Sequence, residues 1–458
     1  MNTLICSRSF KEINVYSMIK LACHTDCNVK LYNSFIITVF FSIFTFSYLV
    51  SNWVDVPYYD EWRMVEFIDC WQKEYCTLWS LVDRDNNHII FFEKLFELIS
   101  YKFFRLDPRV EMLAGLMFII FTVFILNLRI VYACDQPKYI DFLFNSIIAM
   151  LFLSLRNWEN LLGPWSVNTA SSTFFFILSV IYISGESYLS ISFGILFCFL
   201  SSISFTNGLF AWPILLGYVL MHKRYYLFGI ILLFSVLFFY WYAQSYLSFI
   251  PYDEFYLSTS IIRFLVLLGA ILSTDPAVIS NAGSVISPLT IPSSAIAGSL
   301  LLLIIIIIIA YLIKNKLIVT HGFSLSIMTY GLLSSLMIAF GRSNLGVEQV
   351  LSSRYYATAV IVYIGLILIA FETSITNLNF KYNLSVSIAL FLLACVFLVS
   401  NIYEWSIGKY RYQFLNSWKI NIINFEQVSD SDLKNPHFPA EFIRQHAAFL
   451  KHNKLHPF

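Results

Sequence analysis

Charge is what this sequence has least of. Only 12% of its 458 residues are Asp, Glu, Lys or Arg, whereas 58% are hydrophobic and the mean hydropathy is +0.71. Soluble domains carry about 25% charged residues, so the composition indicates a protein that crosses a membrane several times. The net charge is +1 and no basic block is present, so we expect no nucleic-acid partner.

The signature motifs of several enzyme classes are also missing. The chain contains no GxxxxGK[ST], GxSxG or HExxH sequence, so nothing predicts ATP hydrolysis or a serine nucleophile. His88, in "DRDNNHII", has no His or Cys partner at the spacing of metal ligands. We therefore expect no metal site and no cofactor, and a divalent cation stays open as an alternative.

Long apolar runs make up most of the chain. About 20 apolar residues span a bilayer, which predicts an all-α, polytopic fold with about eleven transmembrane helices. The first run lacks a small-residue cleavage site, so it reads as a membrane helix that is retained. A further run, 257–276, either crosses as a twelfth span or lies at the interface. The eleven predicted spans are 33–52, 110–132, 139–155, 169–185, 188–204, 209–221, 225–247, 293–313, 322–340, 356–372 and 383–403.

The orientation follows from Lys and Arg in short loops, which favour the cytoplasmic side. These residues all fall on one side only if 257–276 does not cross. We therefore place the N-terminal arm, 1–32, in the cytoplasm and the C-terminal segment, 404–458, outside. The membrane domain, 33–403, then has two large outer loops, 53–109 and 248–292. The residues that decide this are Arg8, Lys11, Lys20, Lys30, Lys138, Lys223, Arg224, Lys314, Lys316 and Lys381.

Two outer segments have helical patterns of their own. The run "NNHIIFFEKLFELISYKFFRL", residues 86–106, predicts an amphipathic helix on the membrane surface with its Lys and Arg on the polar face. The chain ends in "PAEFIRQHAAFLKHNKLHPF", where Pro439 marks the start of a short docked helix. Its expected apolar residues are Phe442, Ala447, Phe449 and Leu450.

The eight cysteines fall in different predicted compartments. Only Cys70 and Cys76, in "CWQKEYC", share an outer loop. In an oxidising compartment they form a small disulfide, and the alternative is two free thiols. The remaining cysteines are placed in the cytoplasm (Cys6, Cys134), on the N-terminal arm (Cys23, Cys27) and within spans (Cys198, Cys395).

The sequence "PYYDEW", residues 57–62, places the adjacent carboxylates Asp60 and Glu61 just past the first span. A carboxylate at the outer face can act as a general base on an acceptor hydroxyl. Inverting glycosyl transfer needs one such base and a stabilised leaving group. The alternative is that one of the two acids caps the helix that follows. A similar hexapeptide, "PYDEFY" at 251–256, also falls on the outer side.

A lipid phosphate as leaving group would need Arg, Lys or backbone N–H partners. Arg156, Arg342 and Arg354 stand at span boundaries in short outer loops, where each could reach a phosphate headgroup. The commoner use of such an arginine is snorkelling to the lipid headgroups. Polar and aromatic residues of the kind that bind sugars are predicted at the same level. They are Tyr59, His88, Trp158, Glu159, Asn160, Trp165, Asn207, Tyr355 and Tyr356.

The segments "PYYDEW", "NNHIIFFEK", "NWENLLGPW", "TNGLFAWP" and "GRSNLGVEQVLSSRYY" carry a resemblance. Together they look like bacterial integral-membrane glycosyltransferases of the GT-C superfamily. The chain is similar in particular to polyprenyl-phosphate-sugar-dependent enzymes that modify O-antigen, such as the serotype-converting, Gtr-type glucosyltransferases. The resemblance in layout covers most of the chain. It implies that Asp60, with Glu61 beside it, is the catalytic carboxylate of the first outer loop.

The resemblance also implies a function. A hexosyl unit, with glucosyl favoured, would pass from a polyprenyl-phosphate donor to a surface glycan such as O-antigen, outside the bacterial cytoplasmic membrane. The expected partners are the lipid-linked sugar, the glycan, membrane lipids, a donor-synthesising membrane enzyme and a flippase. An O-antigen polymerase and a transporter of polysaccharide or lipid-linked sugar remain alternatives. A transporter would be expected to carry charged or broken segments at mid-membrane depth.

Overall fold

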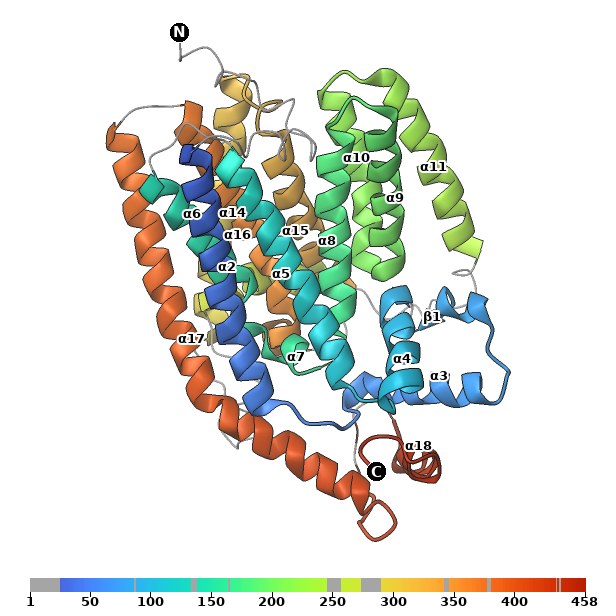
Figure 1. The fold of residues 1–458 in the computed structure, drawn as a ribbon. Coiled ribbons are helices and arrows are strands. Elements are labelled where there is room, and N and C mark those ends of the chain that lie inside the picture. The colour runs from blue at the N-terminus through green and yellow to red at the C-terminus, as the bar shows by residue number, and fades with distance from the viewer. Residues whose placement is uncertain are drawn as a thin grey trace.

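The computed structural model describes residues 25–85, 88–132, 138–163, 165–244, 257–272, 290–341, 346–376, 380–433, 435 and 438–458. Helices account for nearly all regular structure in these ranges and stand side by side in one bundle (Figure 1). The described strands are β1 (Arg84–Asp85) and β2 (His88–Ile89), which pair in antiparallel fashion. The prediction of an all-α fold is confirmed.

Each of the eleven predicted spans coincides with a helix. Within the described ranges, nine helices are long and apolar enough to cross a membrane, and α9 and α10 are shorter. A multi-pass membrane protein is thus indicated, while eleven crossings stay a prediction. The helices are α2 (Thr25–Asn52), α5 (Arg109–Tyr132), α6 (Lys138–Phe152), α8 (Ser166–Ile183), α9 (Tyr188–Ser204), α10 (Ala211–Met221), α11 (Tyr225–Gln244), α14 (Thr290–Lys314), α15 (Gly322–Gly341), α16 (Ser353–Thr376) and α17 (Phe380–Ile423).

The ambiguous run 257–276 contains a short helix, α12 (Leu257–Gly269), followed by the 3₁₀ turn η6 (Ala270–Leu272). Thirteen residues make a helix of about 20 Å, less than the roughly 30 Å hydrocarbon core. Its backbone lies directly against α14, because a Cβ added at Gly269 would fall 1.9 Å from the Ser294 carbonyl oxygen. The length favours the reading in which this segment does not cross.

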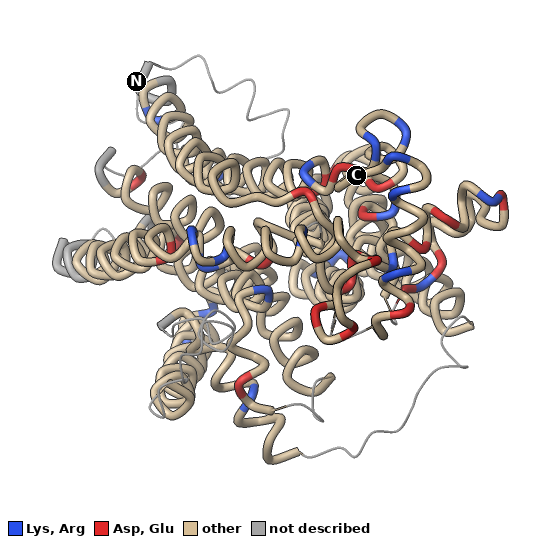
Figure 2. Tube along the Cα trace, turned by 90° about the horizontal axis from the view of Figure 1, so that it is seen from below, with Lys and Arg blue, Asp and Glu red and all other residues tan. Residues whose placement is uncertain are grey.

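The two ends of the bundle differ in what they carry. The start of α2 and the chain's C-terminal residues lie at opposite ends (Figure 1). Seen from below, most charged positions gather around the C-terminal marker (Figure 2). This end holds the short elements η2 (Tyr59–Glu61), α3 (Trp62–Gln72), η3 (Leu78–Leu81), α4 (Phe91–Phe104), η4 (Leu155–Asn157), α7 (Trp158–Leu161), η5 (Thr206–Phe210), η7 (Val347–Leu351) and α18 (Ala440–His452).

Helix α4 forms where an amphipathic helix was predicted, but its charged face points inward. Glu93, Lys94 and Glu97 are buried, while Phe103 is 67% exposed. The Lys94 Nζ donates to the carbonyl oxygens of Ser80 at 2.9 Å and Asp83 at 2.8 Å. The expectation that all basic residues of this segment lie on the outer, polar face is therefore wrong for Lys94, because those two carbonyls bind it inside.

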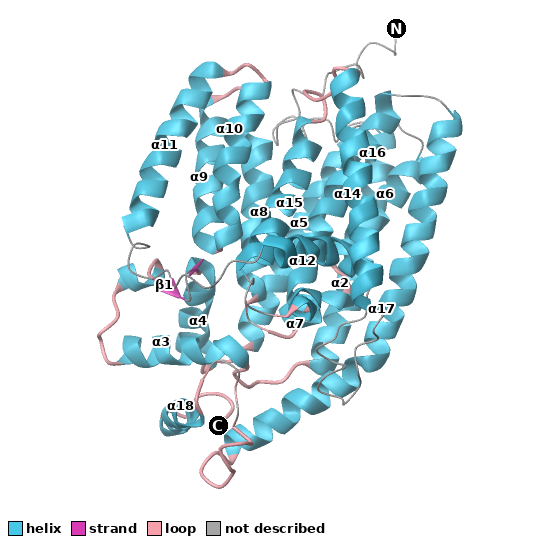
Figure 3. Ribbon diagram, turned by 180° about the vertical axis from the view of Figure 1, so that it is seen from behind, coloured by secondary structure: helices cyan, strands magenta, loops and turns pink. Residues whose placement is uncertain are grey.

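The C-terminal segment packs against the loop 53–109. Helix α17 does not end at residue 403 but continues to Ile423, along the outside of the bundle and past its lower end (Figure 3). Its Trp418 Nε1 donates to the Pro57 carbonyl oxygen at 2.8 Å, and Lys419 pairs with Asp55 at 2.5 Å. Pro439 is the N-cap of α18, so the predicted short helix is confirmed.

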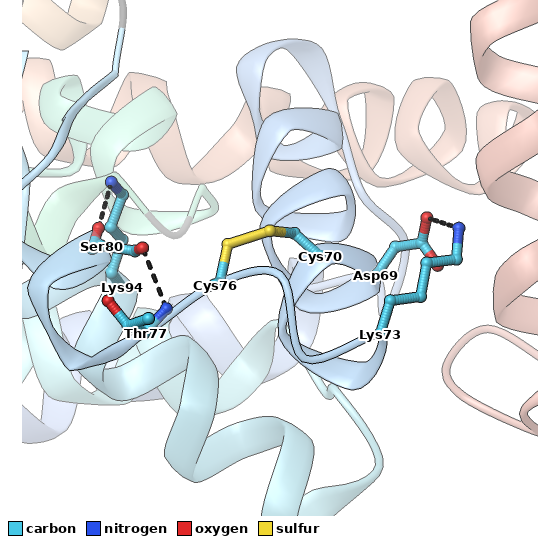
Figure 4. The surroundings of a disulfide bond; sticks show 7 residues. All are labelled: Asp69, Cys70, Lys73, Cys76, Thr77, Ser80 and Lys94. Carbon is cyan, nitrogen blue, oxygen red and sulfur yellow. Dashed lines mark hydrogen bonds and ion pairs between the residues drawn. A yellow bond between two sulfur atoms is a disulfide. The ribbon is translucent and has the colours of Figure 1, made fainter.

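A disulfide joins Cys70, near the end of α3, to Cys76 (Figure 4). Their Cα atoms are 5.4 Å apart, and the bond closes the turn that leaves α3. Cys198 is a buried free thiol and Cys395 an exposed one, both within predicted spans. Cys6, Cys23 and Cys134 lie outside the described residues, as does the side chain of Cys27.

Candidate active site

A cavity of about 720 Å³ lies where the loop 53–109 meets the ends of the long apolar helices. The wall toward the loop is polar, and the wall formed by α11 and α15 is largely apolar. The residues that line it are Asp60, Arg63, Asp85, His88, Ile90, Glu93, Asn160, Trp165, Asn168, Thr169, Phe205, Thr206, Asn207, Leu209, Phe239, Tyr242, Ala243, Met337, Ile338, Gly341, Arg354, Tyr355 and Thr358.

Of the two adjacent acids, Asp60 lines this cavity and Glu61 does not. Glu61 is 4% exposed, and its Oε2 accepts a hydrogen bond of 2.8 Å from the Tyr58 backbone N–H. Glu61 therefore caps the turn into α3, which is the alternative that the sequence left open for one of the pair. The proposed catalytic role rests on Asp60.

The backbone just before Asp60 is held in an unusual conformation. Tyr59 has φ of 50°, in the left-handed region that non-glycine residues avoid at a cost of about 1–2 kcal/mol. Its ring centroid lies 4.0 Å from that of Tyr58 and 6.3 Å from that of Trp165. Such strain persists only where the surroundings fix it, and it clusters at functional sites. Tyr59 itself stands beside the cavity rather than in its lining.

Arg354 occupies the first turn of α16, opposite the loop 53–109. Its backbone N–H donates to Glu159 Oε2 at 3.0 Å, and its carbonyl oxygen accepts from Asn160 Nδ2 at 2.9 Å. The guanidinium interacts electrostatically with Asp60 and with Glu159. Arg354 is therefore fixed through its main chain, while its side chain carries positive charge into the cavity near Asp60.

Glu159 is buried behind this arginine rather than in the cavity wall. Its Oε2 also accepts hydrogen bonds from the hydroxyls of Ser352 and, at 2.9 Å, Ser353. Three donors at the beginning of α16 thus converge on one carboxylate oxygen. A negative charge at a helix N-terminus is favourable, so Glu159 positions the start of this helix.

Arg156 and Trp158 also lie away from the cavity. Arg156 Nη1 donates to the Ile271 carbonyl oxygen, and its Nε is 3.8 Å from Glu404 Oε1. The Arg411 guanidinium stacks over the Trp158 ring at 4.6 Å. Arg156 is only 7% exposed, so it does not snorkel or reach a headgroup in this structure. It ties η4 to α17 through a buried ion pair.

His88 lines the cavity and fastens the two-stranded hairpin to the bundle. Its Nδ1 shares a hydrogen bond with the Thr206 hydroxyl, and its ring lies 4.8 Å from that of Phe205. On the preceding strand, the Arg84 guanidinium lies 4.1 Å above the Tyr242 ring. The hairpin is thereby held against η5 and the end of α11.

Seven of the predicted site residues therefore meet in one cavity although they come from five separate parts of the chain. Arg342 and the "PYDEFY" segment lie outside the described residues. Tyr59, Glu61, Arg156, Trp158 and Glu159 lie nearby but do not line it. The seven that do are Asp60, His88, Asn160, Trp165, Asn207, Arg354 and Tyr355.

Sequence reasoning missed several lining residues. Arg63 Nη1 forms a 3.0 Å ion pair with Asp85 Oδ1, and Asn168 Nδ2 donates to Glu93 Oε2. Glu93 was not predicted because its helix was expected to lie on the membrane surface. Asn168 was not predicted because it stands at the start of an apolar span. Among these residues, only Asp85 and Arg63 could have been suspected from the sequence, because both are charged and lie in the loop 53–109 that the sequence analysis had selected.

Burial changes the charge of the carboxyl groups in this region. It raises the pKa of Glu93 to about 8, and the neighbouring Asp85, Glu97 and Asp60 add to that rise. Burial also raises the pKa of Asp85 above its ordinary value, although Arg63 opposes the shift. At pH 7 Glu93 therefore carries a proton, and the cavity holds less negative charge than its three carboxyl groups suggest.

Comparisons with protein-family models, with curated proteins and with solved structures found no match to the chain. Among the residues that the structure describes, no group of three or more His, Cys, Asp or Glu side chains is arranged to hold a metal ion. The expectation of no metal stays a prediction. Any functional reading rests on the chemistry of the cavity.

Proposed function

We propose that this protein is a GT-C-like membrane glycosyltransferase that moves a hexosyl unit from a polyprenyl phosphate to a surface glycan. One observation carries the proposal. Asp60 from the loop 53–109 and Arg354 from the start of α16 share one cavity, at the boundary between a polar loop and apolar helices. An inverting transferase with a lipid-phosphate donor needs a base and a cation in that arrangement.

The cavity offers a separate place for each part of the donor. The Arg354 guanidinium can bind a phosphate through two parallel hydrogen bonds. Phe239 and Ala243 of α11, with Met337 and Ile338 of α15, supply the apolar wall. We assign the lipid chain to this wall and the sugar to the polar side.

The transfer step uses Asp60 as the base. As the acceptor hydroxyl oxygen attacks the anomeric carbon, its proton passes to the Asp60 carboxylate and the new glycosidic bond forms. The bond between the anomeric carbon and the phosphate oxygen breaks, and the lipid phosphate leaves with both electrons of that bond. Arg354 stabilises the charge that develops on the leaving phosphate.

The same proposal includes the surroundings of the enzyme. The chain would have eleven spans in the bacterial cytoplasmic membrane, with residues 1–32 in the cytoplasm and 404–458 in the periplasm. A donor-synthesising membrane enzyme and a flippase would supply the lipid-linked sugar. This arrangement is supported by the opposite placement of the α2 start and the C-terminal segment in the bundle.

The test is Asp60→Asn, since an amide cannot accept the proton. We expect transfer to fall by about 10²–10⁴-fold with unchanged membrane insertion, measured by analysis of the host surface polysaccharide and by transfer in membranes. Asp69→Asn is the matched control, because Asp69 lies in the same loop, pairs with Lys73 at 2.6 Å and does not line the cavity.

Two outcomes would contradict the proposal. Glycans that lose chain length rather than a side-branch sugar would indicate the polymerase alternative. Normal transfer by Asp60→Asn together with its loss in Asp253→Asn would move the base to the "PYDEFY" segment.

A further inference from the structure

Three large side chains are exposed on one short stretch of the loop 53–109. Tyr75 is 81%, Leu78 73% and Trp79 79% exposed. Tyr75 belongs to the turn that leaves α3, next to the Cys70–Cys76 disulfide, and the other two begin η3. We call residues 75–79 the apolar turn. Large apolar side chains gathered on a protein surface mark a contact with another protein or with a membrane.

The main chain of the apolar turn is fixed. The disulfide closes the turn, and the Tyr75 N–H donates to the Cys70 carbonyl oxygen at 3.1 Å. The Ser80 hydroxyl oxygen accepts from the Thr77 N–H at 3.1 Å, and the Ser80 carbonyl oxygen accepts from Lys94 Nζ of α4 at 2.9 Å (Figure 4). The exposed side chains therefore stand on a turn that α4 holds in place, not on a frayed end.

The apolar turn stands at the level where α11 ends. η3 ends at Leu81 and β1 begins at Arg84, and this length of chain spans at most about 11 Å. The Arg84 guanidinium lies 4.1 Å above the ring of Tyr242, near the end of α11. Figures 1 and 3, which view the molecule from opposite sides, both place β1 just beyond the lower end of α11.

The bilayer is expected to reach this level along α11. This helix is long and apolar enough to cross a membrane, and its Leu233 and Tyr240 are 58% and 66% exposed. In a membrane protein such side chains face lipid. Trp and Tyr concentrate where the bilayer meets water, so the apolar turn has the composition and the position of a segment that continues the lipid-facing surface of α11.

The area of the apolar turn suits a membrane better than a protein partner. A buried aromatic side chain contributes roughly 150–250 Å², so two aromatic residues and one leucine supply about 500 Å². A stable protein interface takes about 800 Å² from each partner. Insertion into a lipid interface has no such threshold, because each apolar group adds its own transfer free energy.

We propose that Tyr75, Leu78 and Trp79 insert into the lipid–water interface beside the end of α11 and hold the loop 53–109 at the membrane surface. The inference goes beyond the proposed function, since it involves neither a sugar nor its transfer. It also assigns the membrane contact of this loop to a segment other than α4, whose charged face is buried. Asp60 lies in the same loop, so its level relative to the lipid phosphates depends on this contact.

Fluorescence quenching by lipid tests the contact. The full chain is placed in phosphatidylcholine nanodiscs with or without bromine atoms on the acyl chains, which quench tryptophans that touch them. The emission of Trp79 is the difference between the wild type and Trp79→Phe. We expect brominated lipid to remove most of this emission.

Trp71→Phe is the matched control. Trp71 ends the apolar part of α3 in the same loop, but its side chain packs against buried core residues. The emission of Trp71, obtained from the same kind of difference, should persist in brominated lipid. Trp79 emission that persists to the same degree as that of Trp71 would overturn the inference.

Photocrosslinking in host membranes identifies what covers the apolar turn. A photoreactive benzoylphenylalanine in place of Trp79 should form adducts with phospholipid, detected by mass spectrometry of the full chain. Adducts with a second copy of the chain or with another protein, in place of lipid, would contradict the membrane contact. Neither readout needs a sugar donor. Failure of the proposed function looks different, because Asp60→Asn would transfer normally while Trp79 still contacted lipid.

Discussion

Replacing Glu159 should destabilise the start of α16 and thereby weaken binding of the donor phosphate by Arg354. Its Oε2 is the common acceptor for the Ser352 and Ser353 hydroxyls and the Arg354 backbone N–H. The Glu159 backbone N–H in turn donates to the Ser353 hydroxyl oxygen at 3.0 Å. Removing the carboxylate by Glu159→Ala leaves the three donors without their acceptor in a buried setting.

The size of the effect follows from those contacts. A hydrogen bond to a charged group contributes about 1.5–3 kcal/mol, and removing one partner of a buried charged set typically costs about 3–5 kcal/mol. We expect Glu159→Ala to lower the free energy of unfolding by about 3–5 kcal/mol. Glu159→Gln should cost less, since its amide oxygen can still accept from one or two of the donors.

Two measurements check this reasoning. Unfolding in detergent measures the free energy of unfolding. Binding of polyprenyl phosphate reports whether the Arg354 side chain is still positioned to bind the phosphate. Glu186→Ala is the control, because Glu186 is exposed in the turn between α8 and α9 at the other end of the bundle. Unchanged stability in Glu159→Ala would refute the hydrogen-bond argument. Reduced stability with unchanged lipid-phosphate binding would show that the start of α16 does not position Arg354 for phosphate binding.

Three other predictions concern the same end of the molecule. Arg354→Ala should weaken binding of polyprenyl phosphate and Arg354→Lys should restore only part of it, since lysine lacks the bidentate fork; full recovery by lysine would argue against paired hydrogen bonds. In the denatured protein, Cys70 and Cys76 should react with a thiol reagent only after reduction, and equal labelling without reduction would exclude the disulfide. The pKa of Glu93 rises from 4.5 to about 8 on folding. The contribution of this group to the free energy of unfolding is therefore complete below pH 4.5 and is lost as the pH rises to about 8. Glu93→Gln should flatten that decline in melting temperature, and an unchanged slope would contradict the shift.

The membrane helices were predictable because their signal is local. Apolar runs and charged turns are properties of neighbouring residues, and each of the eleven predicted ranges coincides with a helix. The end of α17 was missed for a related reason. Leu415, Trp418 and Ile422 recur at helical spacing and are buried, but they are separated by polar residues, so hydropathy fell while the helix continued.

The roles of polar residues at the span boundaries were less predictable. Arg156, Glu159 and Asn160 are close in sequence, yet Arg156 pairs with Glu404, Glu159 holds α16 and only Asn160 faces the cavity. The direction of each side chain depends on partners far away in the chain. The same holds for α4, where the buried position of Glu93 depends on Asn168. Sequence spacing contains no information about such partners.

The contacts between the C-terminal segment and the first loop have a consequence for how the protein matures. Trp418 and Lys419 bind the segment just before Asp60, and His456 lies 3.1 Å from Asp55, across a sequence separation of 401 residues. During synthesis the loop leaves the ribosome long before these partners exist. It can take up its described conformation only after the intervening membrane helices have been made, so the site would be among the last parts of the molecule to assemble.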